Sequence, residues 1–257
     1  MQQVLHTLLL VGPMAFLAGV VDAIAGGGGL ILLPAYLAAG LPAHLAVGTN
    51  KCTSIAGTTV ATARYIRQKK LYWPAALAAA ATAFPGSYAG SLLNLYVPDR
   101  TMHLVLMVLL PVIGIALAFH PTLGEGGRWQ RMPRRRLMAV CMGIGFVLGA
   151  YDGFFGPGSG TFMMLCFAAL AGFDLVTANG NSKLVNLATN LASVVAFARA
   201  GSIWYAAAVP AALCAMAGGW VGSGLALSRG SKVIRPVYYA VLALLLGKVA
   251  FDFFGKV

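Results

Sequence analysis

Residues 19–51 read GVVDAIAGGGGLILLPAYLAAGLPAHLAVGTNK, an apolar stretch interrupted by four consecutive glycines. Glycine at this density breaks a helix, because its backbone loses more conformational entropy on ordering than that of any other residue. The apolar piece that follows, residues 30–39, is about half as long as a helix that crosses the hydrocarbon core of a membrane. Irregular backbone is tolerated at membrane depth only where it is buried in protein or lines a watery cavity. The stretch therefore predicts a broken, re-entrant helical hairpin in a membrane protein.

The composition of the chain supports a membrane location. Of the 257 residues, 60% are hydrophobic and 9% are charged, whereas soluble domains have about 25% charged residues. The mean hydropathy is +0.83. The net charge of +12 comes from basic residues in short runs between apolar stretches. Such runs orient membrane proteins, while a nucleic-acid partner would need basic residues spread over a soluble surface, so we expect no nucleic-acid binding.

The interrupted pattern occurs twice. GVVDAIAG at residues 19–26 matches GAYDGFFG at residues 149–156 with an offset of 130, and GTNK at residues 48–51 matches GNSK at residues 180–183 with an offset of 132. The chain is therefore predicted to be an internal duplication. Within one transmembrane domain over residues 1–257, we expect repeat 1 at 1–119, a basic cytoplasmic loop at 120–136 and repeat 2 at 137–257.

Each repeat is expected to hold one broken hairpin and three transmembrane helices, which gives about eight transmembrane segments in an all-α fold. The candidate segments are residues 4–21, 44–63, 74–97, 103–119, 137–150, 184–198, 204–227 and 236–254.

The basic loops predict how the repeats are oriented, since cytoplasmic loops carry the excess of Lys and Arg. If each hairpin enters and leaves on one side, each repeat crosses the membrane three times and the second repeat is inverted. Loops 64–70, 128–136 and 229–235 then lie on one side with 12 basic residues, against 3 on the other. In the alternative arrangement, parallel repeats with eight full crossings, the basic residues divide 11 against 4 between the two sides of the membrane. We expect inverted repeats with both termini on the non-cytoplasmic side.

Four ionisable residues form two matched pairs inside the apolar regions. Asp22 and Asp152 come just before the glycine clusters, and Lys51 and Lys183 are expected to begin the next helices. A charge at membrane depth costs several kcal/mol, so these residues are expected to face a cavity or a partner. Broken helices of two repeats commonly form a transport site at the midplane. The alternative is a structural bridge within each repeat, with Lys51 paired to Asp22 and Lys183 to Asp152.

The hydrogen-bond donors predict the ligand of that site. A helix N-terminus presents unpaired N–H groups and a partial positive charge, which favour an anion. The glycine clusters leave such amides open, and the GTNK and GNSK elements add hydroxyl, amide and ammonium donors at an expected second pair of helix starts. This set suits a sulfonate, sulfite or carboxylate. The candidate substrate-binding residues are Gly26, Gly27, Gly28, Gly29, Thr49, Asn50, Lys51, Gly156, Gly158, Ser159, Gly160, Asn181, Ser182, Lys183 and Asn186.

The roles of several other polar and small residues can be interpreted from the sequence, in some cases in two ways. Asp22 and Asp152 are candidates for coupling to a proton or cation, or for capping helix starts. Asn186 and Asn190 stand four apart and either extend the polar wall or make interhelical hydrogen bonds. The scattered glycines are expected to be close-packing surfaces between helices; these are Gly143, Gly145, Gly218, Gly219, Gly222 and Gly224.

The same motifs resemble the two signatures of the sulfite exporter TauE/SafE family of membrane permeases. Residues 19–51 carry the first, and residues 149–190, with YDGFFGPGSGTF and GNSKLVNLATN, are similar to the second. The resemblance spans essentially the whole chain. It implies a secondary transporter of small anions, often sulfur-containing, in the bacterial inner membrane, either an exporter or an importer. Repeat 2 has Asn181-Ser182 where repeat 1 has Thr49-Asn50, so the two halves of a site would not be equivalent.

Other function classes fit the residues less well. A membrane enzyme needs a nucleophile with a base or a metal cluster, and the sequence has no HExxH motif and no closely paired carboxylates. We therefore expect no enzyme, no cofactor and no bound metal. The alternative transporter is a divalent metal-ion carrier or channel, which would need several His, Cys, Asp or Glu ligands on one path. The expected partners are a small anion, the lipid bilayer and a coupling proton or cation.

Overall fold

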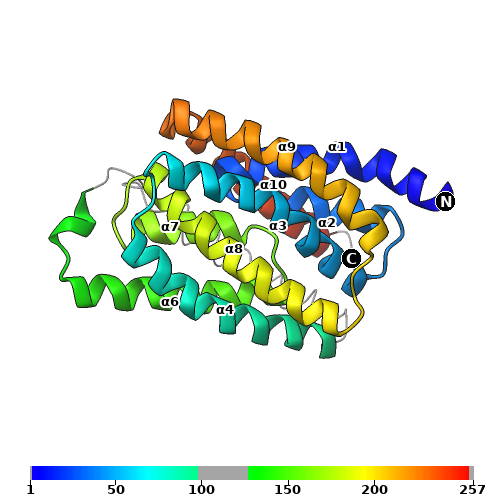
Figure 1. Cartoon of the computed structure of the whole chain (residues 1–257), viewed down its shortest axis with the longest axis horizontal. Coiled ribbons are helices and arrows are strands. Elements are labelled where there is room, and N and C mark those ends of the chain that lie inside the picture. Colours follow the sequence, from blue (N-terminus) through cyan, green and yellow to red (C-terminus); the bar gives the residue numbers. More distant parts are fainter. Residues whose placement is uncertain (1, 98–126, 255–257) are drawn as a thin grey trace.

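The computed structural model describes residues 2–97 and 127–254, which are helices joined by turns (Figure 1). The expected segment at residues 103–119 lies outside these ranges. The described elements are α1 (Gln2–Ala25), α2 (Gly29–Ala38), α3 (Ala43–Arg67), α4 (Trp73–Tyr96), the 3₁₀ turn η1 (Arg128–Arg131), α6 (Arg134–Phe154), α7 (Ser159–Ala169), α8 (Leu175–Arg199), α9 (Tyr205–Arg229) and α10 (Ser231–Phe254).

Both glycine clusters break helices where the sequence predicts. After α1, Gly26 has a φ of 83°, and after α6, Gly156 has a φ of 96°. Glycine adopts this left-handed conformation without the steric cost that other residues meet. The two breaks touch each other: the Thr161 hydroxyl donates to the Ala25 carbonyl oxygen at 2.7 Å, and a Cβ on Gly26 would overlap the backbone of Gly160.

The helices that follow the hairpins begin well before the two lysines. The start of α3 agrees with the expected segment 44–63, whereas α8 begins before the expected segment 184–198. α3 begins at Ala43 and α8 at Leu175. The Asp174 carboxylate caps α8 by accepting from the backbone amides of Val176 and Thr177. Lys51 and Lys183 therefore lie inside these helices, and the prediction that GTNK and GNSK stand at helix starts is wrong. The apolar residues between each start and each lysine continue the helix, so the single glycine in each element does not end it.

α3 and α8 run antiparallel past each other. Near the start of α3, a Cβ on Gly48 would overlap the carbonyl oxygen of Ser202, in the turn after α8. Near the start of α8, a Cβ on Gly180 would overlap the carbonyl oxygen of Lys70, in the turn after α3. The start of each helix therefore packs against the turn that follows the other helix.

The outer helices pair across the halves of the chain. α1 packs along α9, and α4 packs along α6. Glycines make these contacts close: a Cβ on Gly145, Gly218, Gly219 or Gly222 would overlap backbone atoms of the neighbouring helix. The close-packing prediction is confirmed for these four. It is wrong for Gly143, which has no atom within 4 Å, while Gly224 leaves room for the Arg64 guanidinium.

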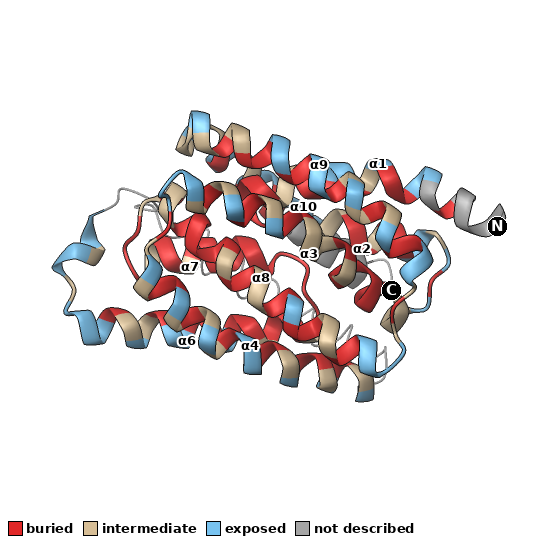
Figure 2. Ribbon diagram, viewed as in Figure 1, coloured by how far each residue is buried: buried red, intermediate tan, exposed pale blue. Residues whose placement is uncertain are grey.

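The outer surface of the bundle is apolar, and its interior holds buried polar residues beside an apolar core. Figure 2 shows α7 and α8 buried along most of their length, while α4, α6 and α9 have exposed faces. Those faces carry large hydrophobic residues such as Leu77, Phe146 and Leu213. In the described part of the chain, α6 and α9 have the length and hydropathy to cross a membrane on those criteria alone. α3 and α8 carry inward polar groups that lower their mean hydropathy. This arrangement is typical of helical membrane proteins.

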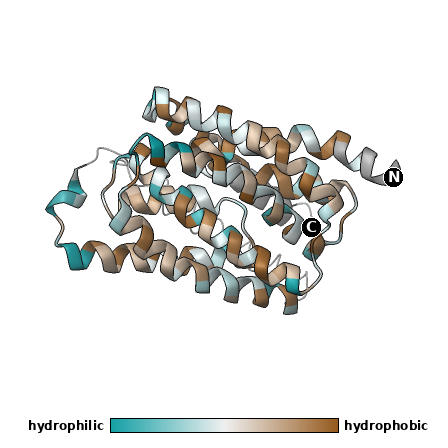
Figure 3. Ribbon diagram, viewed as in Figure 1, coloured by the Kyte–Doolittle hydropathy of each residue, from teal (hydrophilic) through white to brown (hydrophobic). Residues whose placement is uncertain are grey.

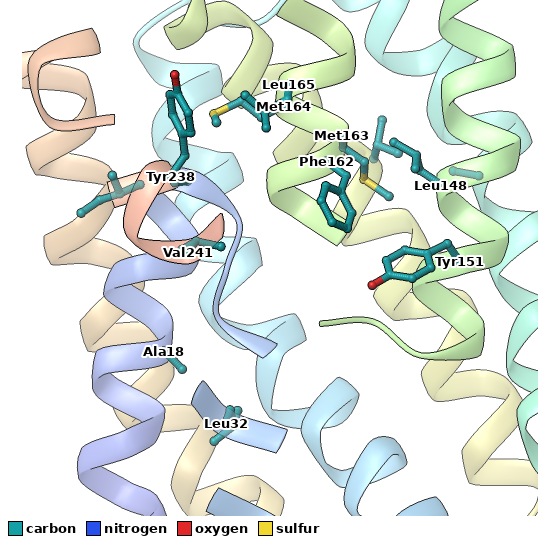
Figure 4. Close-up of a cluster of buried hydrophobic side chains, with 14 of the residues drawn as sticks. Ala18, Leu32, Leu148, Tyr151, Phe162, Met163, Met164, Leu165, Tyr238 and Val241 are labelled. Carbon is teal, nitrogen blue, oxygen red and sulfur yellow. The ribbon is translucent and has the colours of Figure 1, made fainter. Parts of the chain in front are cut away.

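The short helix α7 anchors the second hairpin in an apolar core. Figure 4 shows its side chains between α6 and α10, and Phe162, Met163, Met164 and Leu165 are fully buried. The rings of Tyr151 and Phe162 lie 5.8 Å apart between centroids.

The basic turns lie together at one end of the bundle. The rings of Tyr72, Trp129 and Phe173 are neighbours, with centroid distances of 4.7 to 5.9 Å. Gly230, after α9, lies near Val176 at the start of α8. Three segments are thus adjacent: the turn after α3, the segment that contains η1 and the turn after α9. Figure 3 shows hydrophilic residues at the end of the bundle that holds η1.

Candidate functional site

Two ion pairs join the helix breaks to the central helices. The Lys51 ammonium lies 2.7 Å from Asp152 Oδ1, and the Lys183 ammonium lies 3.0 Å from Asp22 Oδ2. Each lysine thus meets the aspartate of the other half of the chain, so the within-repeat pairing considered from the sequence is wrong. Because α3 and α8 run antiparallel, each lysine lies at the helix break of the other half of the chain.

Three of the four charged side chains are almost fully enclosed. The exposed fractions are 3% for Lys51, 2% for Asp152 and 0% for Lys183, against 18% for Asp22. Breaking such a pair by removing one partner strands a buried charge and costs about 3–5 kcal/mol. The pairs are therefore strong links between the two halves.

A small polar cavity lies where the breaks meet α3 and α8. It has room for about one water molecule. A second small cavity, between α1, α3 and α9, adjoins it through Asp22 and Ser54. The first cavity is lined by Asp22, Gly26, Gly29, Asn50, Lys51, Ser54, Asp152, Gly156, Ser159, Asn186 and Asn190.

Ser54 and Asn190 also line this cavity. For Asn190, the expected place on the polar wall agrees with the cavity lining. Ser54 is not among the predicted binding residues, although it follows Asn50 by four residues and this spacing puts both on one helix face. Asn190 also donates to Asn186 Oδ1 at 2.8 Å and to Thr58 Oγ1 of α3 at 3.5 Å, so it serves the wall and an interhelical hydrogen bond together.

Two buried acceptors at the cavity have no hydrogen-bond partner within the described structure. They are Asp152 Oδ2 and Asn50 Oδ1. The other oxygen of Asp152, Oδ1, accepts from the Ser159 hydroxyl as well as from Lys51. Unpartnered buried polar atoms are uncommon in proteins. Of the four within the described structure, these two belong to residues of the cavity wall, whereas Asn179 Oδ1 and Asn181 Nδ2 do not.

Thr49 and Asn181 point away from the cavity, although both were predicted to bind substrate. Thr49 Oγ1 accepts from the backbone amide of Trp204, and Asn181 Oδ1 accepts from that of Tyr72, both at 2.9 Å. Tyr72 and Trp204 are the N-cap residues of α4 and α9. Each side chain thus holds the start of a helix from the other half of the chain.

Other predicted binding residues also lie beside the cavity rather than on its wall. A Cβ on Gly27 would overlap the side chain of Val241, and the Ser182 hydroxyl donates to the Gly160 carbonyl oxygen at 3.2 Å. The residues of this kind are Gly27, Gly28, Gly158, Gly160, Ser182 and Lys183.

Neither aspartate caps a helix start. The N-cap residues of α2 and α7 are Gly28 and Gly158, without a side-chain hydrogen bond. Asp22 and Asp152 instead lie in the last turns of α1 and α6, where their carboxylates meet the lysines.

The end of α1 is held by Lys183 and by Asn179, which the sequence did not single out. Asn179 donates to the carbonyl oxygens of Ala23 and Ile24, at 3.2 and 2.7 Å. It also donates to the Tyr65 hydroxyl at 2.7 Å. Lys183 donates to the backbone carbonyl of Asp22. Helix-end carbonyls lack intrahelical partners, so these contacts allow α1 to end inside the bundle.

The site offers little to a metal ion. Among the residues that the structure describes, no group of three or more His, Cys, Asp or Glu side chains lies close enough to hold one. The alternative of a divalent metal-ion carrier gains no support from the geometry.

Comparison with known proteins identifies relatives along nearly the whole chain. The sulfite exporter TauE/SafE family matches residues 11–249. The probable membrane transporter protein YfcA of Escherichia coli K12 is 35% identical, covering 98% of this chain and 95% of that protein. A probable membrane transporter protein of Haemophilus influenzae is 32% identical over 93% of this chain and 92% of its own. The ORF9 transporter protein of a Sinorhizobium species is 33% identical, with 92% and 89% covered.

No solved structure matches the chain. The relatives are named as probable membrane transporters, in agreement with the apolar outer surface of the fold and its buried polar residues. The chain therefore belongs to the sulfite exporter TauE/SafE family, and it is a multi-pass membrane transporter rather than an enzyme.

Proposed function

We propose that this protein is a secondary transporter of small anions such as sulfite, organosulfonates or related oxyanions. The observation that carries the proposal is the pair of crossed Lys–Asp bridges around a cavity between two helix breaks. An ammonium group with hydroxyl and amide neighbours is suited to an oxyanion. Lys51 is the cation on the cavity wall, with Asn50, Ser54, Ser159 and Asn186 around it.

The transport cycle would be alternating access between two inverted repeats. The antiparallel crossing of α3 and α8 supports inversion, because parallel repeats would place the two helix starts together. The reciprocal packing of α1 on α9 and of α4 on α6 also supports it. In this cycle the repeats rock about the central site. The cavity, with room for about one water molecule, would have to widen to admit the anion.

The protein would sit in a bacterial inner membrane with its basic end in the cytoplasm. The turns after α3, around η1 and after α9 lie at that end, and they carry most of the Lys and Arg. The positive-inside tendency supports this orientation. Both chain termini would then be on the non-cytoplasmic side. Asp22 and Asp152 are the candidates for coupling to a proton or cation.

Anion counterflow in liposomes tests the proposal. Purified protein is reconstituted with unlabelled anion inside, and uptake of labelled sulfite or methanesulfonate is measured. We expect uptake by the native chain and loss of uptake in Lys51→Met, because the anion then has no cation on the cavity wall. Lys232→Met is the matched control, since Lys232 is exposed at the start of α10. Absence of counterflow with every anion, or native uptake in Lys51→Met, would contradict the proposal.

A further inference from the structure

The two ion pairs differ in how firmly each lysine is held. The Lys183 ammonium donates both to the Asp22 carboxylate and to the Asp22 backbone carbonyl. It is fully enclosed and is not part of the cavity wall. Among described residues, the Lys51 ammonium has one acceptor, Asp152 Oδ1, and it faces the cavity. Lys51 is therefore the lysine that a ligand could take from its aspartate.

The Asp152 carboxylate has an oxygen available for a proton. Its Oδ1 is occupied by Lys51 and Ser159, while its Oδ2 is buried and unpartnered. An ionised carboxylate only accepts hydrogen bonds, whereas a protonated one also donates. Asn50 Oδ1, the other unpartnered acceptor, lines the same cavity. A proton on Asp152 would thus meet an acceptor-rich wall.

The charges around the cavity sum to zero. Asp152 faces Lys51 from α3, and Asp22 of α1 lies on the same wall with Lys183 behind it. The nearby hydroxyl of Tyr151 donates to the Pro157 carbonyl oxygen at 2.7 Å. Adding one anion to this balanced set would leave an unpaired buried negative charge, which is costly. An anion accompanied by one proton leaves the sum unchanged.

We infer that Asp152 takes up one proton with each anion that Lys51 binds, so that transport is an electroneutral proton–anion symport. The inference rests on the proposed function. In the loaded site, neutral Asp152 releases Lys51, which pairs with the anion, while Lys183 and Asp22 remain paired. When anion and proton leave together, the Lys51–Asp152 pair forms again. Asp22 holds Lys183 in place, and Asp152 carries the proton that is coupled to the anion.

Accumulation driven by a pH gradient tests the inference in liposomes. The probe is labelled methanesulfonate, which stays singly charged at every pH used. With the outside more acidic by about one unit, we expect the native chain to accumulate the probe about tenfold, because one proton moves with each anion. An imposed membrane potential should not change this ratio. Asp152→Asn should lose the proton-driven accumulation, since an amide carries no exchangeable acid proton. Any counterflow that this variant retains should not respond to the pH gradient.

Asp174→Asn is the matched control and should keep accumulation, because Asp174 caps α8 away from the cavity and an asparagine can also cap a helix. A native chain that shows counterflow without proton-driven accumulation overturns the inference but leaves the proposed function standing. A native chain without counterflow of any anion overturns both. Accumulation by Asp152→Asn, or its loss in Asp174→Asn as well, assigns the proton elsewhere and also overturns the inference.

A second measurement does not depend on how the Asp152→Asn variant folds. A pH-sensitive dye sealed inside liposomes that contain the native protein measures how many protons enter with the probe. One proton for each anion is the expected result, and uptake without acidification overturns the inference. Asp152→Glu, which retains a carboxylate that can exchange its proton, should keep the acidification.

Discussion

The ends of α1 and α6 carry the same sequence pattern but are held in different ways. Each of the last four carbonyl groups of α1 accepts from a repeat 2 side chain, supplied by Lys183, Asn179 or Thr161. At the end of α6, Ser91 and Asn94 of α4 reach two carbonyl groups. The lysine that meets α6, unlike Lys183, contacts the carboxylate alone.

This difference shows how a duplicated motif can divide two tasks. Each of the last four carbonyl groups of α1 has a side-chain donor, so the Lys183–Asp22 pair is part of a rigid support. The end of α6 leaves Asp152 with an unused oxygen on the cavity wall. Ligand and proton exchange are therefore assigned to the second break.

The largest expected effect separates the two lysines by stability. Lys183→Met removes two contacts to Asp22, one at its carboxylate and one at its backbone carbonyl, and leaves the carboxylate charge without its cation, so we expect a loss of about 3–5 kcal/mol. Lys51→Met should cost less, because Lys51 contacts a carboxylate alone and Asp152 keeps the hydrogen bond from the Ser159 hydroxyl. Unfolding of each variant in detergent measures the order. If Lys51→Met is the less stable of the two, the division of tasks is wrong.

The next effect concerns the ties on α1. Asn179→Leu leaves the Ile24 carbonyl oxygen without its donor, while the Ala23 carbonyl oxygen keeps the Tyr65 hydroxyl. We expect a loss of about 1–3 kcal/mol for the orphaned group. The same detergent unfolding measurement applies. Thr59→Val is the control, since the exposed Thr59 hydroxyl bonds only within its own helix, to Ile55. Equal stability of Asn179→Leu and the control would show that α1 needs no such ties.

The close contacts between α3, α8 and the opposite turns give a smaller effect. Gly48→Ala and Gly180→Ala each place a methyl group against a carbonyl oxygen, and we expect a loss of about 1–3 kcal/mol from overpacking. Gly143→Ala, in open space on α6, should instead gain roughly 0.5–1 kcal/mol. A Gly48 or Gly180 variant as stable as Gly143→Ala would contradict the antiparallel crossing.

The smallest expected effect is at the end of α6. Ser91→Ala removes one donor to the Gly153 carbonyl oxygen, at 3.2 Å. Interhelical hydrogen bonds of this kind contribute about 0.6 kcal/mol on average in membrane proteins. We expect counterflow to remain at the native rate. A loss as large as that of Asn179→Leu would show that the second break is tied as firmly as the first.

The sequence predicted the breaks because glycine clusters act locally. It placed Asp22 and Asp152 just before them, and the structure confirms both positions. It did not predict where α8 begins, since capping by Asp174 lies upstream of the motif. It assigned Thr49 to the substrate, although the partner of Thr49 is a helix start in the other half of the chain.

By itself, the sequence determined that the chain is an apolar, duplicated helical protein with two broken hairpins and four ionisable residues at matched positions. Those properties depend on composition and on neighbours along the chain. The tertiary structure decided which lysine meets which aspartate and which of the two pairs faces the cavity. The physical reason is the antiparallel crossing of α3 and α8, which exchanges partners between the repeats and buries one lysine more deeply than the other.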